Sequence, residues 1–479
     1  MVTPRPNWAE LDPEIYWQGC VATVREVLEQ TEQKEIAVIS VSSQGETLIA
    51  LDHFGKPVYP AIVWLDNRAE LEAKVLAERF SGEVYEKTGI PEILATWTAS
   101  KILWLRNNEP QAFERVEKFM LVQDYLTYRL TGEYATNLSI SCTSMLVDIV
   151  QGTWWGDVLS TIGIDEQKLP TLIPTGEIIG TVTPDVADQI GIRESTIVIG
   201  AGMDQSVGAI GAGNIHEGVV SETTGAALTI QVTIPSPGVD RNKVIPVYYH
   251  SIPGKYLFVP VCPTGGMALK WMRDTFAEAE IEASKKSGVD SYDLLTKLAS
   301  DVPPGCDGLV MLPHLMGAYS PTPNPLARGS FTGFSLNHTR GHFVRAVLEG
   351  VAFLLKQNLE VLQTAGIEIS EIRSTGGGAR SHLWNQIKAN VCNVPVITFR
   401  NEDTALLGDA ILGGVAAGVF KSIEEGCNEM IILADRVVPD SQAASYVAAY
   451  QRYSDLDHSL VGFFHRQYRN YDSEREENS

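Results

Sequence analysis

Residues 197–213 read Ile-Val-Ile-Gly-Ala-Gly-Met-Asp-Gln-Ser-Val-Gly-Ala-Ile-Gly-Ala-Gly. The apolar, β-branched run at 196–199 predicts a strand, as does the run Val219–Thr223 further on, and the glycines between them let backbone or a ligand come close. The stretch places a single carboxylate, Asp204, among small residues, so this side chain is a candidate general base. An equally simple role on local sequence is that Asp204 caps a helix over residues 205–211.

The totals of the chain predict its class. A length of 479 residues exceeds the roughly 250–300 residues that one hydrophobic core usually serves, so we expect two domains. A formal net charge of −22 argues against a nucleic-acid or anionic-membrane surface, because phosphate backbones recruit clustered Lys and Arg. A bound nucleotide stays compatible with that charge, since backbone N–H groups and Mg²⁺ can hold its phosphates.

The cysteines and the hydropathy pattern indicate a compartment. The six cysteines form no C-x-x-C pair, which favours buried thiols in a reducing environment and argues against a structural zinc site. No run of about 18 apolar residues occurs, and the first residues lack an apolar signal core. We therefore expect a cytoplasmic protein.

A polar segment separates two predicted strands in the first part of the chain. Residues 36–41 and 47–51 are rich in β-formers, and the break between them reads Ser-Ser-Gln-Gly-Glu. A third predicted strand, at 60–64, ends in Trp64-Leu65-Asp66-Asn67-Arg68. Because polar breaks between core strands are common places for ligands, these strand ends form a candidate binding region.

A second glycine-rich turn lies in the other half. The predicted strand Glu371–Thr375 runs into Gly376-Gly377-Gly378-Ala379 and then into an amphipathic helix. Glycines at such a turn allow a ligand to approach free N–H groups and the positive end of the helix dipole, so the turn predicts a phosphate or nucleotide site. No Lys-Ser or Lys-Thr follows, which excludes the Walker pattern, and a tight turn without a ligand is the alternative.

Other local patterns complete the prediction. Asp12-Pro13 predicts a helix start, and the small residues within 405–419 predict a helix that packs closely against another backbone. The charged tail from Tyr471 is typical of a disordered end. Because strands feed glycine turns and then helices in both halves, the pattern favours an α/β fold with two similar-sized domains.

Several sequence blocks, in this order along the chain, resemble the FGGY family of carbohydrate kinases, which includes xylulose, ribulose and glycerol kinases. The blocks lie at residues 7–13, 44–46, 61–69, 124–126, 130–132, 200–205, 329–333, 345–350, 376–379 and 404–418. The resemblance implies an α/β fold of two actin-like (ribonuclease H-like) ATPase domains around a central cleft. Residues 1–212 would form the domain on the sugar side, and residues 213–479 the domain on the nucleotide side.

The resemblance also implies a function. It indicates ATP-dependent phosphorylation of a sugar hydroxyl, with ATP and Mg²⁺ as cofactors and a small-molecule sugar as substrate. A ketose such as a pentulose is the first choice, and a polyol is the alternative. Gly45-Glu46 stand where xylulose kinases usually show Met-His, and the Glu is closer to the glycerol-kinase pattern. No nucleic-acid or membrane partner is implied, and a homodimer is an assembly open to such a chain.

By the family pattern, Asp204 would be the general base that takes the proton from the substrate hydroxyl. The substrate-binding positions would be Gln44, Glu46, Trp64, Asp66 and Gln205. The positions near the nucleotide would be Gly225, Gly266, Gly377, Gly378 and Ala379. From the residues alone, simpler roles are open to two of them: Trp64 as a core aromatic and Asp66 as a partner of Arg68.

Two features depart from the family pattern. Family members begin with a strand and an Asp-x-Gly-Thr turn that holds phosphate, and this sequence starts at the block after it. We therefore expect the N-terminal phosphate-binding hairpin to be missing, turnover to be poor, and a sheet edge to need covering. Ala226 stands where Thr is usual, which removes a hydrogen bond worth on the order of 1 kcal/mol.

A non-catalytic sugar- or nucleotide-binding relative, acting as sensor or partner subunit, is the alternative to a kinase.

Overall fold

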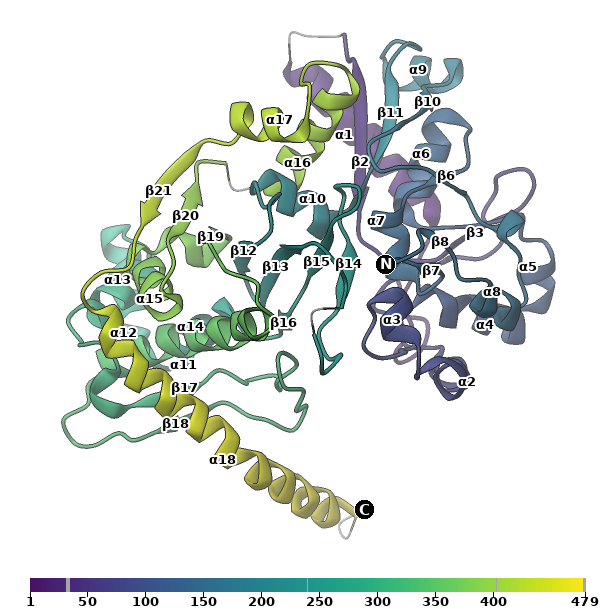
Figure 1. The fold of residues 1–479 in the computed structure, drawn as a ribbon. Coiled ribbons are helices and arrows are strands. Elements are labelled where there is room, and N and C mark those ends of the chain that lie inside the picture. The colour runs from purple at the N-terminus through teal and green to yellow at the C-terminus, as the bar shows by residue number, and fades with distance from the viewer. Residues whose placement is uncertain (32–34, 239, 402, 477–479) are drawn as a thin grey trace.

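The chain forms two lobes, each built on its own β-sheet, in the computed structural model shown in Figure 1. The structure describes residues 1–31, 35–238, 240–401 and 403–476, with side chains described as far as residue 467. Among these residues, no helix is both long and apolar enough to cross a membrane.

The sheet of the first lobe has three strands in the order β10-β11-β2. Strand β11 (Ile197–Met203) runs parallel to β2 (Val38–Ser43) and antiparallel to β10 (Ile178–Thr181). Short two-stranded ladders surround it: β1 (Glu10–Leu11) with β4 (Ala61–Ile62), β3 (Ile49–Leu51) with β5 (Lys118–Met120), β6 (Ala135–Thr136) with β9 (Thr171–Leu172), and β7 (Val147–Asp148) with β8 (Thr153–Trp154).

Helices cover this sheet and its ladders. They are α1 (Pro13–Gln30), α2 (Glu70–Phe80), α3 (Val84–Thr88), α4 (Thr98–Asn108), α5 (Pro110–Glu114), α6 (Val122–Thr131), α7 (Leu138–Ser141), α8 (Gly156–Ile162), α9 (Pro184–Ile190) and α10 (Asp204–Gly211). The Asp12-Pro13 prediction is confirmed, because Asp12 is the N-cap of α1 and its side chain accepts the N–H of Glu14.

The second lobe has a larger, mixed sheet. Its strands are β14 (Val247–Tyr249), β15 (Tyr256–Phe258), β13 (Leu228–Ile234), β12 (Val219–Thr224), β19 (Glu371–Thr375), β20 (Val396–Phe399) and β21 (Leu433–Val437), in that order, with β16 (Val261–Cys262) beside β13. Strands β17 (Val310–Leu312) and β18 (Ser330–Thr332) pair separately.

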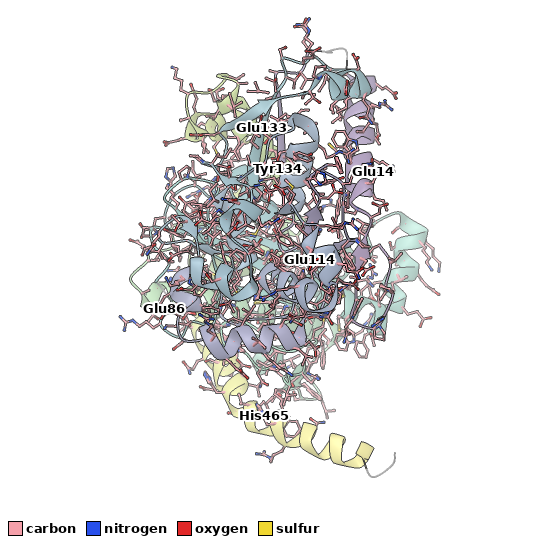
Figure 2. All side chains as sticks on the ribbon, turned by 90° about the vertical axis from the view of Figure 1, so that its right-hand side faces the viewer. Glu14, Glu86, Glu114, Glu133, Tyr134 and His465 are labelled. Carbon is pink, nitrogen blue, oxygen red and sulfur yellow. The ribbon has the colours of Figure 1, made fainter. Side chains whose placement is uncertain are left out.

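The helices of the second lobe are α11 (Gly266–Phe276), α12 (Glu278–Ser287), α13 (Ser291–Ser300), α14 (Arg340–Thr364), α15 (His382–Cys392), α16 (Thr404–Ala416), α17 (Ile423–Met430) and α18 (Ala443–Glu476). Figure 2 shows α18 extending away from the body, with His465 on its projecting part. The prediction of a disordered tail from Tyr471 is wrong for residues 471–476, which continue α18, while residues 477–479 lie outside the described residues.

Helices α10 and α16 join the two lobes by a crossing without side chains at its closest points. A Cβ on Gly211 would lie 1.8 Å from the carbonyl oxygen of Thr404, and one on Gly408 would lie 2.0 Å from that of Val207. The predicted close packing of the small-residue helix is therefore confirmed, since only glycine fits at these contacts. The same helix carries Asp409, whose carboxylate accepts hydrogen bonds from Ser40 at 2.9 Å and Ser42 at 2.6 Å on β2.

The hydrophobic cores follow the lobes. The larger core fills the second lobe around β12, β13 and α14, while two smaller cores support the helices and ladders of the first lobe. All six cysteines are free, and four of them are buried, in agreement with the sequence expectation of reduced thiols.

Candidate active site

Asp204 is the first residue of α10, at the point where β11 ends. The capping prediction is corrected in its detail: the N-cap is Met203, and the Asp204 carboxylate accepts the N–H of Gln205 at 2.7 Å from within the helix. Burial raises the pKa of Asp204, and this N–H lowers it. Partial burial therefore makes Asp204 a stronger proton acceptor than a free aspartate, while the helix N-terminus keeps the anion accessible.

Buried side chains fix the end of β11 that leads into Asp204. The Gln123 side chain accepts the N–H of Gly202 at 2.6 Å, and the Ser139 hydroxyl accepts the N–H of Met203 at 3.3 Å. Gly202 has φ +112°, and a Cβ there would lie 2.4 Å from the Ser139 hydroxyl oxygen. Only glycine fits this turn, so the sequence Gly-Met-Asp sets the direction in which Asp204 points.

Gln205 lies next to Asp204 on the exposed side of α10. Its side-chain oxygen accepts a hydrogen bond from Gln231 on β13, which belongs to the second lobe. This contact connects the predicted sugar-binding glutamine to the sheet that also ends at the glycine turn of residues 224–227. Gln205 is therefore held at the junction between the two lobes.

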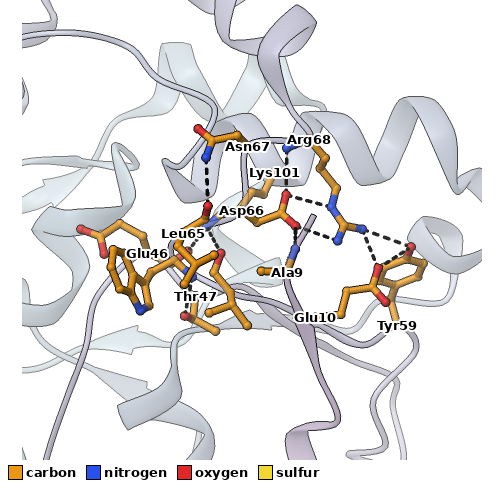
Figure 3. Close-up of polar contacts among 12 residues, drawn as sticks. Ala9, Glu10, Glu46, Thr47, Tyr59, Leu65, Asp66, Asn67, Arg68 and Lys101 are labelled. Atoms are coloured by element: carbon orange, nitrogen blue, oxygen red, sulfur yellow. Dashed lines mark hydrogen bonds and ion pairs between the residues drawn. The ribbon is translucent and has the colours of Figure 1, made fainter. Parts of the chain in front are cut away.

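The predicted sugar side is a set of strand ends joined by Thr47, shown in Figure 3. The Thr47 hydroxyl accepts the backbone N–H of Trp64 and the side-chain amide of Gln44, each at 3.0 Å. The same Gln44 amide donates to the Tyr16 hydroxyl at 3.1 Å. Trp64 is 47% exposed, which contradicts the alternative role as a core aromatic and leaves its ring face free for a ligand.

Glu46 has a backbone conformation unusual for its type. Its φ is +56°, in the left-handed region, and its N–H donates to the Thr143 hydroxyl at 3.3 Å. Burial raises the pKa of Glu46, the Lys101 ammonium opposes that rise, and the Asp204 carboxylate adds to it. Glu46 follows β2 and Asp204 follows β11, and these strands pair in parallel with Ser43 opposite Met203, so the polar strand break and the candidate base lie at the same edge of the sheet.

Asp66 is fully occupied by protein partners. Both of its oxygens bind the Arg68 guanidinium, at 2.9 and 2.8 Å, and it also accepts the N–H of Ala9. Its side chain is fully buried, as is that of Arg68, which in turn binds Glu10 at 2.8 Å. Figure 3 shows this network beside the Thr47 joint. The geometry favours the simpler role that the sequence left open for Asp66, a structural partner of Arg68.

On the second lobe, a cavity of about 370 Å³ is lined by four of the five residues predicted to lie near the nucleotide. These are Gly225, Gly266, Gly377 and Gly378. The fifth, Ala379, lies on the other side of the turn and lines a neighbouring cavity. The ring of Trp384 and the side chains of Met267, Leu269 and Tyr292 contribute to the wall of the main cavity. Glycines and apolar side chains together suit a phosphate chain and a planar base.

The glycines at this cavity leave room and donors for an anion. A Cβ on Gly377 would meet nothing within 4 Å, whereas one on Gly378 would lie 2.6 Å from the Thr224 side chain. In the described part of the chain, the N–H groups of Gly377 and Gly378 have no hydrogen-bond partner. Adjacent free N–H groups at a strand-to-helix turn are a frequent phosphate-binding arrangement, so the residues present fit ATP.

A buried ion pair lies at the end of β12, beside the glycine turn of residues 376–379. Lys388 on α15 binds Glu222 of β12 at 2.5 Å and the Thr224 hydroxyl at 3.0 Å.

For Mg²⁺, the described residues contain no group of three or more His, Cys, Asp or Glu side chains that could hold a metal ion. Such an ion is usually bound by one or two carboxylates together with substrate phosphates and water, so a dedicated protein cage is not required.

Sequence reasoning missed Lys101, Thr47, Thr143 and Gln123, all of which position the predicted residues. A signal existed for one of them. Lys101 stands four residues after Trp97 and four before Leu105, which places it on the buried face of α4. A lysine in such a phase needs polar partners inside the protein, and Lys101 donates to the carbonyl oxygens of Glu46 and Val63.

Comparisons with known proteins agree with this geometry. The model of the N-terminal domain of the FGGY family of carbohydrate kinases matches residues 1–211, and that of its C-terminal domain matches residues 223–417. The chain is 34% identical to gluconokinase from Bacillus subtilis over 88% of this chain and 83% of the relative. It is 32% identical to xylulose kinase from Staphylococcus epidermidis over 90% of this chain and 84% of the relative.

A solved structure gives the same result for the fold. The xylulose kinase from Rhodospirillum rubrum superposes with a TM-score of 0.87 at 28% identity, over 97% of this chain and 93% of that one. The predicted fold class, two actin-like α/β domains, is therefore confirmed. These relatives are kinases by name, and none supports the non-catalytic alternative. The chain belongs to the FGGY family of carbohydrate kinases.

Proposed function

We propose that this kinase transfers the γ-phosphoryl group of ATP to a hydroxyl of a ketose such as a pentulose, or of a polyol. The catalytic cleft would lie between a domain of residues 1–212 and a domain of residues 213–479. The observation that carries the proposal is the parallel pairing of β2 with β11, which sets Ser43 opposite Met203 and so brings residues 44–46 and Asp204 to the same edge of the sheet. It unites the candidate base with the candidate sugar-binding residues, while the glycine-lined cavity supplies a place for the nucleotide.

Asp204 would act as general base. As its carboxylate accepts the proton of the attacking hydroxyl, the hydroxyl oxygen becomes more nucleophilic towards the γ-phosphorus. The raised pKa of Asp204 supports this role, because a stronger base shares the proton more fully in the transition state. A positioned base of this kind contributes about 10²- to 10⁴-fold to the rate.

The sugar would be held by Gln44, Glu46, Trp64 and Gln205. The Glu46 carboxylate can accept hydroxyl protons, and the exposed Trp64 ring can cover the C–H face of a polyol. Gln205 would contribute from beside the base. For Asp66 we propose only an indirect contribution, since Arg68 and Ala9 already bind both of its oxygens.

The nucleotide would occupy the cavity beside the glycine turn. When bound, ATP supplies the phosphoryl group, and Mg²⁺ offsets the negative charge that develops on it. The free N–H groups of Gly377 and Gly378 would orient the phosphates, with Gly225 and Gly266 leaving space for close approach. Ala379 would support the turn from its other side.

A turnover assay with the purified chain tests this proposal. ATP consumption is measured with a panel of ketopentoses, ketohexoses, glycerol and gluconate, alongside thermal-shift binding of each sugar and of ATP. Turnover with at least one sugar that is lost in Asp204→Asn supports the proposal, and turnover that persists in that variant contradicts it.

A further inference from the structure

Lys101 is a fully buried lysine that takes no part in the proposed phosphoryl transfer. It lies on α4 among apolar neighbours, and its ammonium donates to the carbonyl oxygens of Glu46 at 2.9 Å and Val63 at 3.0 Å. In the described residues, no carboxylate lies within salt-bridge distance of it. Because burial of a charge is costly, a lysine in this place indicates a specific requirement for its charge or its donors.

The two carbonyl groups belong to the two strand ends of the sugar side. Glu46 lies in the break between β2 and β3, and Val63 follows β4 and directly precedes Trp64. One ammonium thus joins the backbone next to the candidate hydroxyl acceptor to the backbone next to the candidate stacking ring. Figure 3 draws Lys101 together with Glu46 and Thr47 of the first segment.

The backbone of Glu46 needs this support. With φ at +56°, a non-glycine residue is held in a sparsely populated conformation, which persists only where its surroundings enforce it. The Thr98 hydroxyl donates to the same Glu46 carbonyl at 3.2 Å, and the Thr143 hydroxyl accepts the Glu46 N–H. A Cβ at Gly45 would lie 2.4 Å from the Thr143 hydroxyl oxygen, so that side of the turn is closed as well.

The charges around Lys101 explain why a cation stands here. Burial is the largest effect and lowers the pKa of Lys101 to about 7; Glu46 and Asp66 favour its charged form, and Arg68 opposes it. Arg68 is already paired with Asp66 and Glu10, while Glu46 and Asp204 repel each other. Lys101 is the cation that acts on Glu46, and it offsets the repulsion from Asp204.

We propose that Lys101 is a positioning residue for the sugar: through its bonds to the carbonyl oxygens of Glu46 and Val63 it holds Glu46 and Trp64 in their binding arrangement. The inference rests on the proposed function for its substrate and goes beyond it in the residue. Its chemical consequence is a site with two carboxylates and one cation whose donors are already used by carbonyl groups. Such a site favours a neutral polyhydroxyl substrate that donates hydrogen bonds over one that carries a carboxylate.

Lys101→Met removes the charge and both hydrogen bonds while keeping a chain of similar length. Because each bond is charge-assisted, we expect the sugar KM to rise roughly tenfold to a hundredfold, with the ATP KM nearly unchanged. Without the cation, Glu46 is protonated at higher pH, so the acidic limb of the sugar kcat/KM profile should move upward. That upward shift should disappear when Lys101→Met is combined with Glu46→Gln. A lysine with a purely structural role would give no shift of the pH profile in Lys101→Met.

Thr98→Val is the matched control, because it removes one neutral hydrogen bond to the same carbonyl and leaves the charge. It should raise the sugar KM less than Lys101→Met and should not shift the pH profile. A rise in sugar and ATP KM by the same factor, or a pH profile unchanged in Lys101→Met, would overturn the proposal.

Amide hydrogen exchange of residues 44–47 and 63–65 gives a readout that does not depend on turnover. Faster exchange at both segments in Lys101→Met supports the positioning role, and unchanged protection contradicts it. If the wild-type protein turned over none of the sugars, the proposed function would be contradicted. The difference in exchange between Lys101→Met and wild type tests the role of Lys101 alone.

Discussion

Asp204 illustrates how a residue acquires two roles from one position. Its carboxylate accepts the N–H of Gln205, the second residue of α10, and its pKa is raised because much of the side chain is removed from water. The hydrogen bond orients the group, and the burial increases its basicity. The N–H of Gln205 binds one carboxylate oxygen, so the other oxygen stays available for a substrate proton.

Replacing Asp204 by Asn tests the base directly. We expect kcat to fall by about 10²- to 10⁴-fold, because the amide cannot accept the proton, with the ATP KM little changed. The measurement is steady-state turnover with the best sugar of the panel. Asp165→Asn, at a distant exposed turn, is the control and should keep the wild-type rate. An equal loss in both variants would contradict the assignment.

The pH dependence of kcat/KM follows from the same residue. The base must be ionised, so in Glu46→Gln, which removes the other carboxyl group that titrates on the acidic limb, activity should rise with pH through the pKa of Asp204 in the free enzyme. Since burial raises that pKa, the midpoint of the acidic limb should lie above the ordinary aspartate value of about 3.9. The profile is measured between pH 4 and 9 with a buffer of constant ionic strength. A midpoint at or below the ordinary value would argue against Asp204 as the titrating group.

At the scale of residues, the sequence predicts small side chains better than polar ones. Gly225, Gly266, Gly377 and Gly378 line one cavity, while their contact with a nucleotide stays a prediction. Asp66 could equally serve a sugar or an arginine, and only the fold shows that Arg68 lies within 3 Å of both its oxygens. Lys101 was missed because its partners are backbone carbonyls, which leave no signature in a sequence.

At the scale of elements, the α10–α16 crossing depends on glycine. At Gly408 a Cβ would lie 2.0 Å from a carbonyl oxygen, a distance that forces the helices apart. A change of rotamer cannot relieve this clash, because the position of a Cβ is fixed by its own backbone and the atom that it would meet is a backbone carbonyl oxygen.

Gly408→Ala and Gly19→Ala form an informative pair of helix substitutions. Gly19, on α1, has open space around its Cβ position, so alanine there should stabilise the protein by about 0.5–1 kcal/mol. At Gly408 the same substitution should destabilise it by about 1–3 kcal/mol or more through overpacking. Chemical denaturation followed by circular dichroism checks both. Equal effects of the two substitutions would contradict the role given to the crossing.

Because the pKa of Asp409 is raised, we expect the free energy of unfolding to depend on pH through this residue at the lobe junction. Burial raises its pKa to about 6 despite the hydrogen bonds from Ser42 and Ser40. A carboxyl whose folded pKa is raised stabilises the fold fully below its unfolded pKa of about 3.9, and this contribution is lost as pH rises through about 6. The shift of about 2 units corresponds to at most about 3 kcal/mol.

In Asp409→Asn this contribution is removed, and the amide can still bond both serines. We therefore expect the free energy of unfolding of the variant to fall less than that of wild type between pH 4 and 7. Denaturant titrations at several pH values measure the difference, and the other raised carboxyl groups cancel in it. Parallel curves for the two proteins would show that Asp409 does not titrate in this range.

Element prediction succeeded where local signals are strong. The strand Glu371–Thr375 and the start of α1 at Pro13 agree with the sequence, because a capping residue or a glycine turn marks each boundary. The end of α18 was not predicted, since charge and polarity in residues 471–476 suit both a disordered tail and an exposed helix. The short ladders of the first lobe depend on pairing between distant segments, which no local pattern reveals.

At the scale of the whole molecule, the proposed sugar side and the proposed nucleotide cavity belong to different lobes. Figure 1 shows the two sheets on either side of α10 and α16. The Gln205–Gln231 and Asp409–serine contacts cross this junction, so each lobe contributes to holding the other.

This division predicts that nucleotide and sugar affinities can be changed separately. Gly377→Leu should raise the ATP KM about tenfold or more, because its side chain would enter the cavity without meeting protein atoms, while sugar binding stays near wild type. Gly82→Leu, at an open surface turn, is the matched control and should alter neither. Thermal shift with ATP alone and with sugar alone measures both affinities. Weakened sugar binding in Gly377→Leu would contradict the separation.

The exposure of Trp64 gives this protein an intrinsic optical reporter. Of its nine tryptophans, all within the described residues, Trp64 is the one that is exposed, and five others are buried. Fluorescence that iodide or acrylamide can quench should therefore arise largely from this ring. A sugar that covers the ring would shield it from the quencher and shift its emission to shorter wavelength. Occupancy of the sugar side can thus be followed in solution without any label.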